Sequence, residues 1–368
     1  MVLIANPNIP PKDDTWSVVE LIGQSPPVDC TAPYDPSTIA GKTILITGGA
    51  SGFGAAFARH WARHGAHIVL GDVNDKAGEA LTAELRIAYP SQTFVYQHCD
   101  VTSWADQVSL YRFAMSSSPS GSIHTVVAAA GIVELANPTS GQHFDFPTSS
   151  LSSSDTIPSP PPLRVINVNL MGVMYTTHLA LHFLPLNKPN KGAGSDSHIL
   201  LISSIAGLLP LPGQTEYAAS KHAVIGLFRT LRATAWSTQQ IRVNCLAPYF
   251  VDTPLLPPAA HALLAGGVLA KLEDVVNAAT RLVADEEIRG RALAIGPRVV
   301  FDEEGMPKQN PVQPHGVWEV YGHDYERVEV FTWRYLKMIN LMRQARGWWG
   351  LAKDLLAIFT GRKGGSRN

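Results

Sequence analysis

From residue 42 onward, hydrophobic and polar positions follow two alternating patterns. Short apolar runs typical of buried strands are followed by stretches in which apolar residues recur every three or four positions, as in amphipathic helices. The runs predicted to be strands are 44–46, 67–70, 93–97, 125–129, 199–203 and 242–246. The predicted helices cover 54–64, 76–89, 104–115, 164–184 and 217–236. This alternation predicts an α/β fold, a doubly wound parallel sheet with helices on both faces.

Three segments depart from that pattern. Residues 1–40 are rich in proline and turn-forming residues and are interpreted as an N-terminal extension. Residues 41–305 are predicted to form a single domain, interrupted at about 137–162 by an insertion dense in Ser, Thr and Pro. Residues 306–368 are interpreted as a C-terminal extension that carries basic amphipathic helices.

Composition narrows the class of protein. The 368 residues are 45 % hydrophobic with a formal net charge of -1, which excludes an intrinsically disordered chain. A nucleic-acid binder would normally show a basic excess, so no nucleic-acid partner is expected. The three cysteines form no disulfide or zinc pattern, which favours a reducing compartment. Because we find no signal peptide and no membrane-spanning run, we expect a cytoplasmic protein.

A glycine-rich loop follows the first predicted strand and leads into a helix. Glycines at such a place let backbone N–H groups approach a pyrophosphate, which the N-terminus of the helix then stabilises. The sheet is therefore expected to be of the Rossmann type, with a dinucleotide at this loop. The residues predicted to hold the cofactor here are Gly48, Ser51, Gly52, Phe53 and Gly54.

Asp72 ends the second predicted strand, about 20 residues beyond the glycines, where a carboxylate accepts hydrogen bonds from the adenosine ribose. The same carboxylate would repel a 2′-phosphate, and the glycine loop contains no Lys or Arg to compensate. We therefore predict NAD in preference to NADP.

Tyr217 and Lys221 stand four residues apart, on one face of a predicted helix. A tyrosine with its ordinary pKa of about 10 is a poor base at neutral pH, but a neighbouring cation favours the phenolate. Lowering the pKa by about 3 units would take roughly 4 kcal/mol of interaction. Ser204, at the end of a predicted strand, is placed to hold a substrate oxygen.

Together, these motifs resemble the short-chain dehydrogenase/reductase family over about residues 41–300. Within it, the chain is most similar to NAD-dependent hydroxyprostaglandin dehydrogenases and to fungal alcohol dehydrogenases of polyketide and terpenoid pathways. The resemblance implies that Tyr217 is the general base or acid, that Lys221 lowers the pKa of Tyr217 and binds the nicotinamide ribose, and that Ser204 orients the substrate oxygen. It also implies that Asn169, in preference to Asn167, positions a proton-relay water.

Further roles follow from the resemblance alone. Cofactor contacts are implied for Asp100, Val101, Gly131, Tyr217, Lys221, Pro248, Val251 and Thr253. Gln214 matches a position that binds substrate in relatives of the prostaglandin type. The chain departs from the family at Ala128 and Ala129, where the family has asparagines, and at Tyr249, where it has glycine. A large ring at 249 would stand near the nicotinamide or the substrate.

The implied reaction is hydride transfer between NAD(H) and a bulky lipophilic secondary alcohol or ketone in secondary-metabolite or lipid metabolism. Two alternatives remain open: an NADP-dependent ketoreductase, and a non-catalytic cofactor-binding protein that shapes a reactive intermediate. Two pairs of histidines, His60 with His64 and His178 with His182, are read as surface or packing residues, so no metal is expected. We further expect a homodimer or homotetramer.

The C-terminal tail carries the basic charge of the chain. Residues 333–368 contain eight Lys and Arg and one Asp, a net charge of +7, so the other 332 residues carry -8. Apolar residues repeat in the tail at helical spacing, and Trp348 and Trp349 suit a lipid headgroup boundary. One hypothesis is peripheral contact with an anionic membrane surface. The other is packing on the protein's own core or across a dimer.

Overall fold

The computed structural model describes residues 23–134, 144–145, 160–161, 163–187, 196–256, 269–298 and 316–320. The chain divides into a compact unit, Gln24–Gly322, and a second unit made of Met1–Gly23 and His323–Asn368. Apart from Gly23, the second unit lies outside the described residues. The predicted basic helices of the tail and most of the predicted insertion therefore also lie outside them.

Eight strands form one sheet in the order β3-β2-β1-β4-β5-β6-β7-β8. All neighbours pair in parallel except β8, which is antiparallel to β7. The strands are β1 Thr43–Thr47, β2 His67–Asp72, β3 Phe94–His98, β4 Thr125–Ala128, β5 His198–Ile202, β6 Arg242–Pro248, β7 Ala292–Ile295 and β8 Val317–Val320. The order reverses between β1 and β4, which confirms the predicted doubly wound α/β fold.

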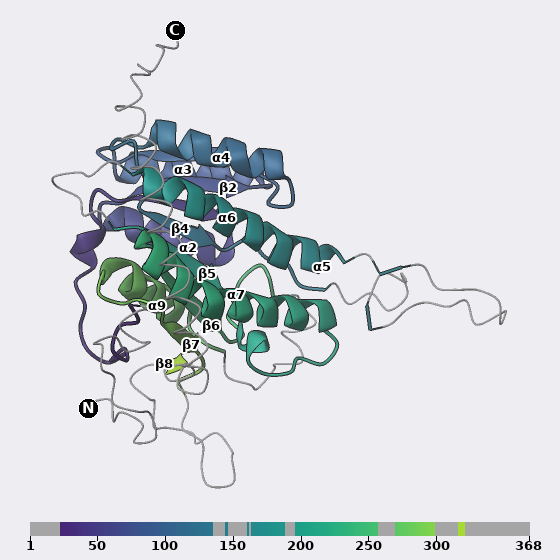
Figure 1. Ribbon diagram of the computed structural model, residues 1–368. Helices are drawn as coiled ribbons and strands as arrows, with labels where there is room; N and C mark the ends of the chain where they lie inside the picture. Colours follow the sequence, from purple (N-terminus) through teal and green to yellow (C-terminus); the bar gives the residue numbers. More distant parts are fainter. Residues whose placement is uncertain are drawn as a thin grey trace, which may run out of the picture. The chain divides into compact units, whose positions relative to one another are not determined.

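Helices cover both faces of this sheet (Figure 1). One core cluster joins α2, α3 and α9 to alternate strand residues such as Ile44 and Ile46. A second cluster joins α4, α6 and α7 to the residues between them, such as Leu45. Because successive side chains of a strand point to opposite faces, each central strand contributes to both cores. The helices are α2 Gly52–Arg63, α3 Asp75–Ala88, α4 Trp104–Ser117, α6 Val173–Phe183, α7 Thr215–Gln239 and α9 Leu272–Ala284.

The predicted helix 164–184 is a composite in the structure. It consists of α5 Arg164–Ile166, the π-helical segment η2 Asn167–Gly172, α6 and the 3₁₀ turn η3 Leu184–Leu186. Gly172 lets this segment approach the loop after β3, since a Cβ there would stand 2.7 Å from Cγ2 of Val101. Within the part of the chain that is described, no helix is both long and apolar enough to cross a membrane.

The compact unit extends beyond the predicted bounds of 41–305 at both ends. The segment before β1 includes the 3₁₀ turn η1 Pro36–Ile39, whose Ile39 is fully buried, and β8 joins the edge of the sheet. Glu319 of β8 pairs with Arg291 at 2.6 Å and accepts a hydrogen bond from the backbone N of Val28 at 2.8 Å. The contact between Val28 and Glu319 joins segments 291 residues apart, so local sequence pattern alone does not indicate it.

Candidate active site

The loop between β1 and α2 forms a cradle that only small residues fit. Gly48 has a φ of +70°, and a Cβ there would stand 2.5 Å from Cα of Ala130. A Cβ on Gly54 would stand 2.3 Å from the carbonyl oxygen of Gly48. Ser51 is the N-cap of α2 and makes no side-chain capping hydrogen bond, so the first turn of α2 keeps backbone N–H donors for an anion. These features fit the pyrophosphate of a dinucleotide.

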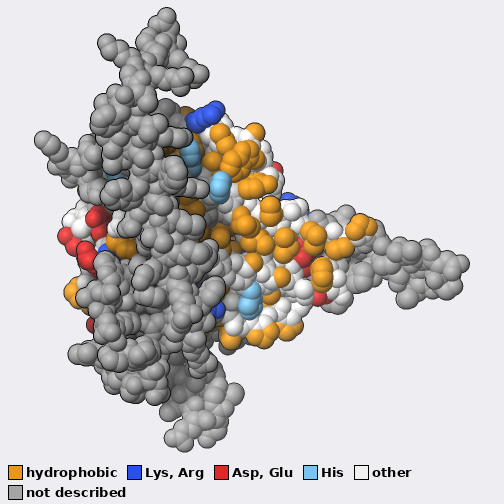
Figure 2. Space-filling model, viewed as in Figure 1, with side chains coloured by type: hydrophobic (Ala, Val, Ile, Leu, Met, Phe, Trp, Pro, Cys, Tyr) orange, Lys and Arg blue, Asp and Glu red, His pale blue; other side chains and the backbone are white. Residues whose placement is uncertain are grey.

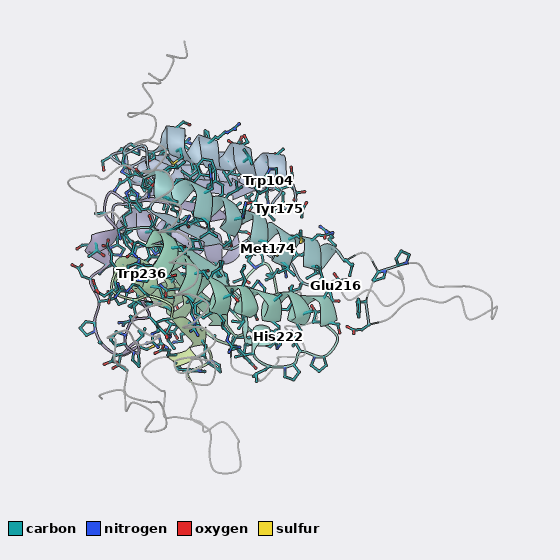
Figure 3. The ribbon with its side chains drawn as sticks, in the orientation of Figure 1. Trp104, Met174, Tyr175, Glu216, His222 and Trp236 are labelled. Atoms are coloured by element: carbon teal, nitrogen blue, oxygen red, sulfur yellow. The ribbon has the colours of Figure 1, made fainter. Side chains whose placement is uncertain are left out.

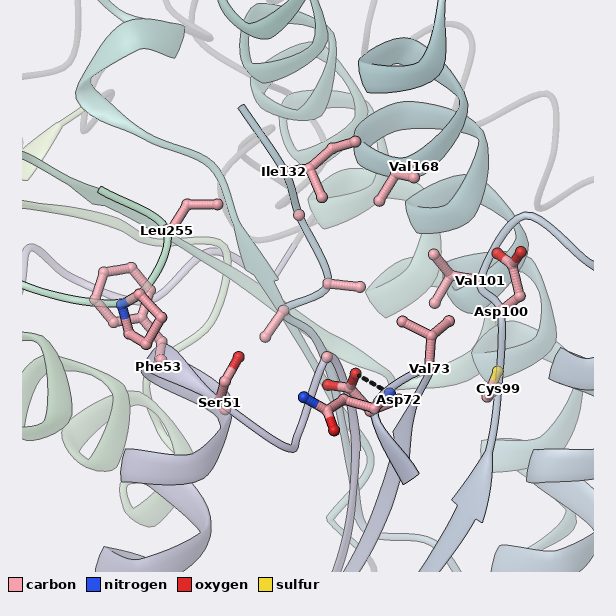
Figure 4. A pocket seen from close by; sticks show the side chains of 18 of the residues that line it. Ser51, Phe53, Asp72, Val73, Cys99, Asp100, Val101, Ile132, Val168 and Leu255 are labelled. Atoms are coloured by element: carbon pink, nitrogen blue, oxygen red, sulfur yellow. Dashed lines mark hydrogen bonds between the residues drawn. The ribbon is translucent and has the colours of Figure 1, made fainter. Parts of the chain in front are cut away.

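A cavity of about 670 Å³ opens above this loop (Figure 4). In Figure 4, Ser51 and Asp72 lie on one side of the cavity and Ile132 and Val168 on the opposite side. Of the residues predicted to bind cofactor, those that line it are Gly48, Ser51, Gly52, Phe53, Gly54, Asp72, Asp100, Val101, Gly131 and Thr253. The structure therefore brings together residues from the ends of β1, β2, β3, β4 and β6, as expected at the carboxyl edge of an open sheet.

The cavity has further lining residues that the sequence analysis missed. They include Val73, Cys99, Thr102, Ile132, Arg164, Val168 and Pro254. Several are direct neighbours of predicted residues along the chain. Arg164 precedes Val168 by four residues, so helical periodicity would have placed the two on one face.

Asp72 holds its carboxylate beside the glycine loop. One oxygen accepts a hydrogen bond from the backbone N of Ala50 at 3.0 Å, and the other accepts from the backbone N of Asn74, also at 3.0 Å. Both bonds come from backbone groups, so the carboxylate is fixed at the cavity wall.

Ser204, Tyr217 and Lys221 lie close together between β5 and α7. The Ser204 side chain lies beside Tyr217 and favours its phenolate. The Ser204 hydroxyl donates to the carbonyl oxygen of Pro248 at 3.4 Å and accepts from the backbone N of Ala206 at 3.1 Å. Lys221 places Nζ 5.6 Å from the centre of the Tyr217 ring and donates to the carbonyl oxygen of Ile202 at 3.1 Å. All three residues are buried.

Gly131 connects this cluster with the cavity. It lines the cavity, and a Cβ at this position would stand 3.6 Å from Nζ of Lys221 and 3.5 Å from Oδ1 of Asn169. Lys221 therefore lies just behind the cavity wall at Gly131, although Ser204, Tyr217 and Lys221 are not themselves among the residues that line the cavity.

Burial dominates the titration of the cluster. It raises the pKa of Tyr217 above its usual value, although the hydrogen bond from Ser204 acts in the opposite direction. Burial also lowers the pKa of Lys221 to about 8. The sequence analysis expected Lys221 to hold the pKa of Tyr217 below its ordinary value. The difference arises because a site with little water disfavours the charged form of both groups.

The amide of Asn169 makes hydrogen bonds with the backbone. Its Oδ1 accepts from the N of Ile132 at 2.8 Å, and its Nδ2 donates to the O of Ile132 at 2.8 Å and to Ser220 at 3.3 Å. Asn169 is fully buried, whereas Asn167 lines the cavity. The proton-relay role implied for Asn169 stays a prediction.

Four other predicted residues do not line the cavity. Gln214 uses its amide on the backbone of Glu134, accepting from its N and donating to its O, both at 3.1 Å. The Tyr249 ring packs against the core on the α2 and α9 face and meets Phe250 edge-on at 4.9 Å. Pro248 ends β6, and Val251 is buried in a bridge to Ala270. The substrate contacts expected at 214 and 249 remain predictions.

Metal ligands were not expected, and the described residues contain no group of three or more His, Cys, Asp or Glu side chains that could hold a metal ion. The rings of His60 in α2 and of His64, the C-cap residue of α2, are tilted by 56° with their centres 4.8 Å apart. Burial is the main cause that lowers the pKa of His60.

Known proteins are similar to this chain in sequence and in fold. The family model described as short chain dehydrogenase matches residues 42–263. The chain is 38 % identical to a 5′-hydroxyaverantin dehydrogenase of Dothistroma septosporum, over 73 % of this chain and 88 % of the relative. It is 33 % identical to the NADP-dependent dehydrogenase clz5 of Cochliobolus lunatus, over 70 % and 89 %. Among solved structures, 3-ketoacyl-(acyl-carrier-protein) reductase from Brucella melitensis complexed with NADH is 26 % identical, with a TM-score of 0.55 and coverage of 70 % of this chain and 97 % of the other.

Proposed function

The chain belongs to the short chain dehydrogenase family of oxidoreductases, and on that premise we propose that it interconverts a bulky lipophilic secondary alcohol and its ketone with NAD(H). The observation that carries this proposal is the burial of Ser204, Tyr217 and Lys221 in one cluster, with Nζ of Lys221 5.6 Å from the centre of the Tyr217 ring. Lys221 of that cluster lies next to Gly131, which lines the cavity above the glycine loop.

Each residue has one task in the proposed oxidation. Ser204 holds the substrate hydroxyl, and Tyr217, as the phenolate, takes its proton. The nicotinamide, when bound, takes the hydride from the carbinol carbon, which leaves a ketone. Lys221 favours the phenolate by its positive charge. In reduction, Tyr217 returns the proton to the ketone oxygen.

NAD is the proposed cofactor because of Asp72. Its carboxylate is held in place by two backbone N–H groups, so it cannot swing away from a 2′-phosphate without losing both bonds. Among the described residues that line the cavity, Arg164 is the only Lys or Arg, and it stands on α5 rather than near β2. Because one relative is named as NADP-dependent, NADP is the alternative cofactor to test.

A lipophilic substrate is proposed from the cavity wall and the relatives. Phe53, Ile132, Val168, Pro254 and Leu255 give the cavity an apolar wall. Leu255 is 37 % exposed, which leaves apolar surface for a substrate to cover. The relative named for 5′-hydroxyaverantin supports a role in fungal secondary metabolism.

Replacing Tyr217 tests the assignment of the base. Tyr217→Phe keeps the ring and removes the hydroxyl, so we expect kcat for a panel of lipophilic secondary alcohols to fall by at least about 100-fold. Tyr89→Phe, on a half-buried tyrosine that ends α3, is the matched control and should keep full activity. Full turnover by Tyr217→Phe would reject the mechanism. A wild-type protein that binds NADH but turns over no alcohol or ketone would favour the non-catalytic alternative.

The cofactor preference has its own test. The ratio of kcat/KM for NAD to that for NADP should favour NAD, and Asp72→Ser should lower this ratio by about 10-fold or more. A wild-type preference for NADP would overturn the cofactor assignment and leave the reaction class intact.

A further inference from the structure

We propose that Glu216 is a positioning residue. It holds two elements against the start of α7, which carries Tyr217: the loop after β4, and the helix from α5 into η2, which carries Asn169. This inference rests on the proposed function, because it concerns the geometry of that same site. Figure 3 shows Glu216 in the first turn of α7, immediately before Tyr217, where this helix lies alongside α5. Glu216 is only 4 % exposed although it carries a carboxyl group.

The loop after β4 is held from two sides by side-chain amides. On one side, Asn169 pairs with both backbone groups of Ile132 at 2.8 Å. On the other side, Gln214 pairs with both backbone groups of Glu134 at 3.1 Å. Each amide replaces the partner that a neighbouring strand would supply, so the loop stays extended beyond the end of β4.

Glu216 connects the two sides. Its backbone N donates to Oε1 of Glu134 at 3.2 Å, which ties the start of α7 to the loop. Its own Oε2 accepts from the backbone N of Val165 at 3.2 Å and of Ile166 at 3.5 Å, and these are first-turn donors of α5 that lack a partner within the helix. Leu163, the N-cap residue of α5, provides no side-chain bond, so Glu216 caps that helix from outside.

Together, these hydrogen bonds link the loop after β4, the helix from α5 into η2, and α7 to one another beside the cavity. Ile132 and Val168 line the cavity, one on the loop and the other on the helix that Glu216 caps. Asn169 donates to the hydroxyl of Ser220 in α7, and this hydroxyl donates to the carbonyl oxygen of Tyr217 at 2.7 Å. Releasing Glu216 would therefore let two cavity walls shift relative to Tyr217, and displacements of about 1 Å can cost about 100-fold in rate.

Two substitutions at Glu216 test the proposal. Glu216→Ala removes the acceptor, and we expect kcat to fall by about 10- to 100-fold, while the stoichiometry of NADH binding stays unchanged. Glu216→Gln keeps a carbonyl oxygen as acceptor and should retain most of the activity with an unshifted pH profile. Glu79→Ala, on an exposed glutamate of α3, is the control.

A second readout does not depend on turnover. Hydrogen exchange at the backbone amides of Ile132, Val165 and Ile166 should be faster in Glu216→Ala than in the wild type, and should be restored in Glu216→Gln. If Glu216→Ala does not fold, Glu134→Ala removes the acceptor of the Glu216 N–H and should give the same loss of kcat and faster exchange at Ile132. Unchanged exchange and unchanged kcat, or equal losses in the Ala and Gln variants, would overturn the proposal. A failed Tyr217→Phe test would instead reject the reaction.

Discussion

At the scale of single residues, burial sets the chemistry of the proposed site. Tyr217 is 9 % exposed and Lys221 5 % exposed, so burial favours the uncharged form of both side chains more than water does. The pKa of Tyr217 is raised, and that of Lys221 is lowered to about 8. Because the two groups lie close together, a rate profile reports the pair rather than either residue alone.

The direction of these pKa shifts predicts the pH dependence of activity. Oxidation needs Tyr217 without its proton, so kcat/KM for the alcohol should rise as the pH increases above neutrality. Reduction of the ketone needs the protonated form and should decline over the same range. Lys221→Met removes the cation that favours the phenolate, so the rise should move to higher pH. A profile for alcohol oxidation that falls with pH would contradict this assignment.

Asp196 is a buried charged residue just before β5, at the amino ends of the strands. Its buried carboxylate pairs with Arg242 at 2.7 Å and with Lys42 at 3.1 Å. The two cations hold the pKa of Asp196 well below its usual range, in spite of burial. Arg242 also donates to the carbonyl oxygens of Leu282 and Ile288, so one guanidinium connects β6 to the segment before β7.

Asp196→Asn should therefore destabilise the fold. It leaves the buried guanidinium of Arg242 without its carboxylate and Lys42 with Glu286 as its remaining partner, so the free energy of unfolding at neutral pH should fall by about 3–5 kcal/mol. Because the pKa of Asp196 is lower in the folded state, its contribution is present above the ordinary carboxyl pKa of about 3.9 and is lost as the pH falls below it. Urea unfolding at neutral and acidic pH measures both effects. Glu84→Gln, in an exposed pair with Arg59, should leave stability unchanged.

At the scale of elements, a helix or strand was predicted correctly where its hydrophobic pattern runs over one continuous stretch of the chain. The predicted strand at 67–70 is observed as His67–Asp72 and the predicted helix at 217–236 as Thr215–Gln239, because their signal is hydrophobic periodicity over one continuous stretch. The sequence analysis did not identify β7 or β8, each four residues long. Their runs are too short for periodicity, and it is pairing that places them in the sheet: β7 pairs in parallel with β6, and β8 pairs in antiparallel with β7.

The turn from β1 to α2 gives a prediction at this scale. Gly48→Ala puts a Cβ at a φ of +70° and 2.5 Å from Cα of Ala130, so the loop must move away from the cavity. We expect NADH affinity to fall by at least about 10-fold and the melting temperature to drop. Gly226→Ala, in α7 with no atom within 4 Å of the added Cβ, should leave NADH affinity unchanged. Equal affinity in both variants would argue against the cradle.

At the scale of the whole molecule, the compact unit exposes one broad apolar surface. Figure 2 shows hydrophobic side chains gathered over α4 and α6. Trp104 is 45 % and Met174 44 % exposed, and Trp104 meets the Tyr175 ring edge-on at 5.4 Å. Residues 165–187 contain no Asp, Glu, Lys or Arg. Contiguous apolar surface without charge is typical of an interface between protein chains.

We therefore expect a second copy of the chain to cover this surface in a symmetric dimer. Met174→Glu would bring two carboxylates into the interface, so light scattering after size exclusion should show a shift toward monomer. Ile87→Glu, at an 85 % exposed position on α3, should leave the oligomeric state unchanged. A wild-type monomer, or a Met174→Glu variant with the wild-type mass, would contradict this expectation.

The basic tail, residues 333–368, has two candidate contacts. Its residues lie outside those described, so the choice between a membrane surface and the protein's own surface stays a hypothesis. Flotation with anionic liposomes, comparing the full chain with one ending near residue 325, separates the two. If neither protein floats, the membrane hypothesis is wrong.

By itself, the sequence determined the α/β order of elements, the glycine loop, Asp72 at the end of β2 and the spacing of Tyr217 and Lys221. Each depends on neighbours within one turn, strand or βα unit, where backbone geometry fixes what side chains can do. Only the tertiary structure decided that Gln214 binds the backbone of Glu134, 80 residues away, and that the Tyr249 ring packs into a core. It also decided the pKa of Tyr217, because burial depends on every segment packed around the side chain.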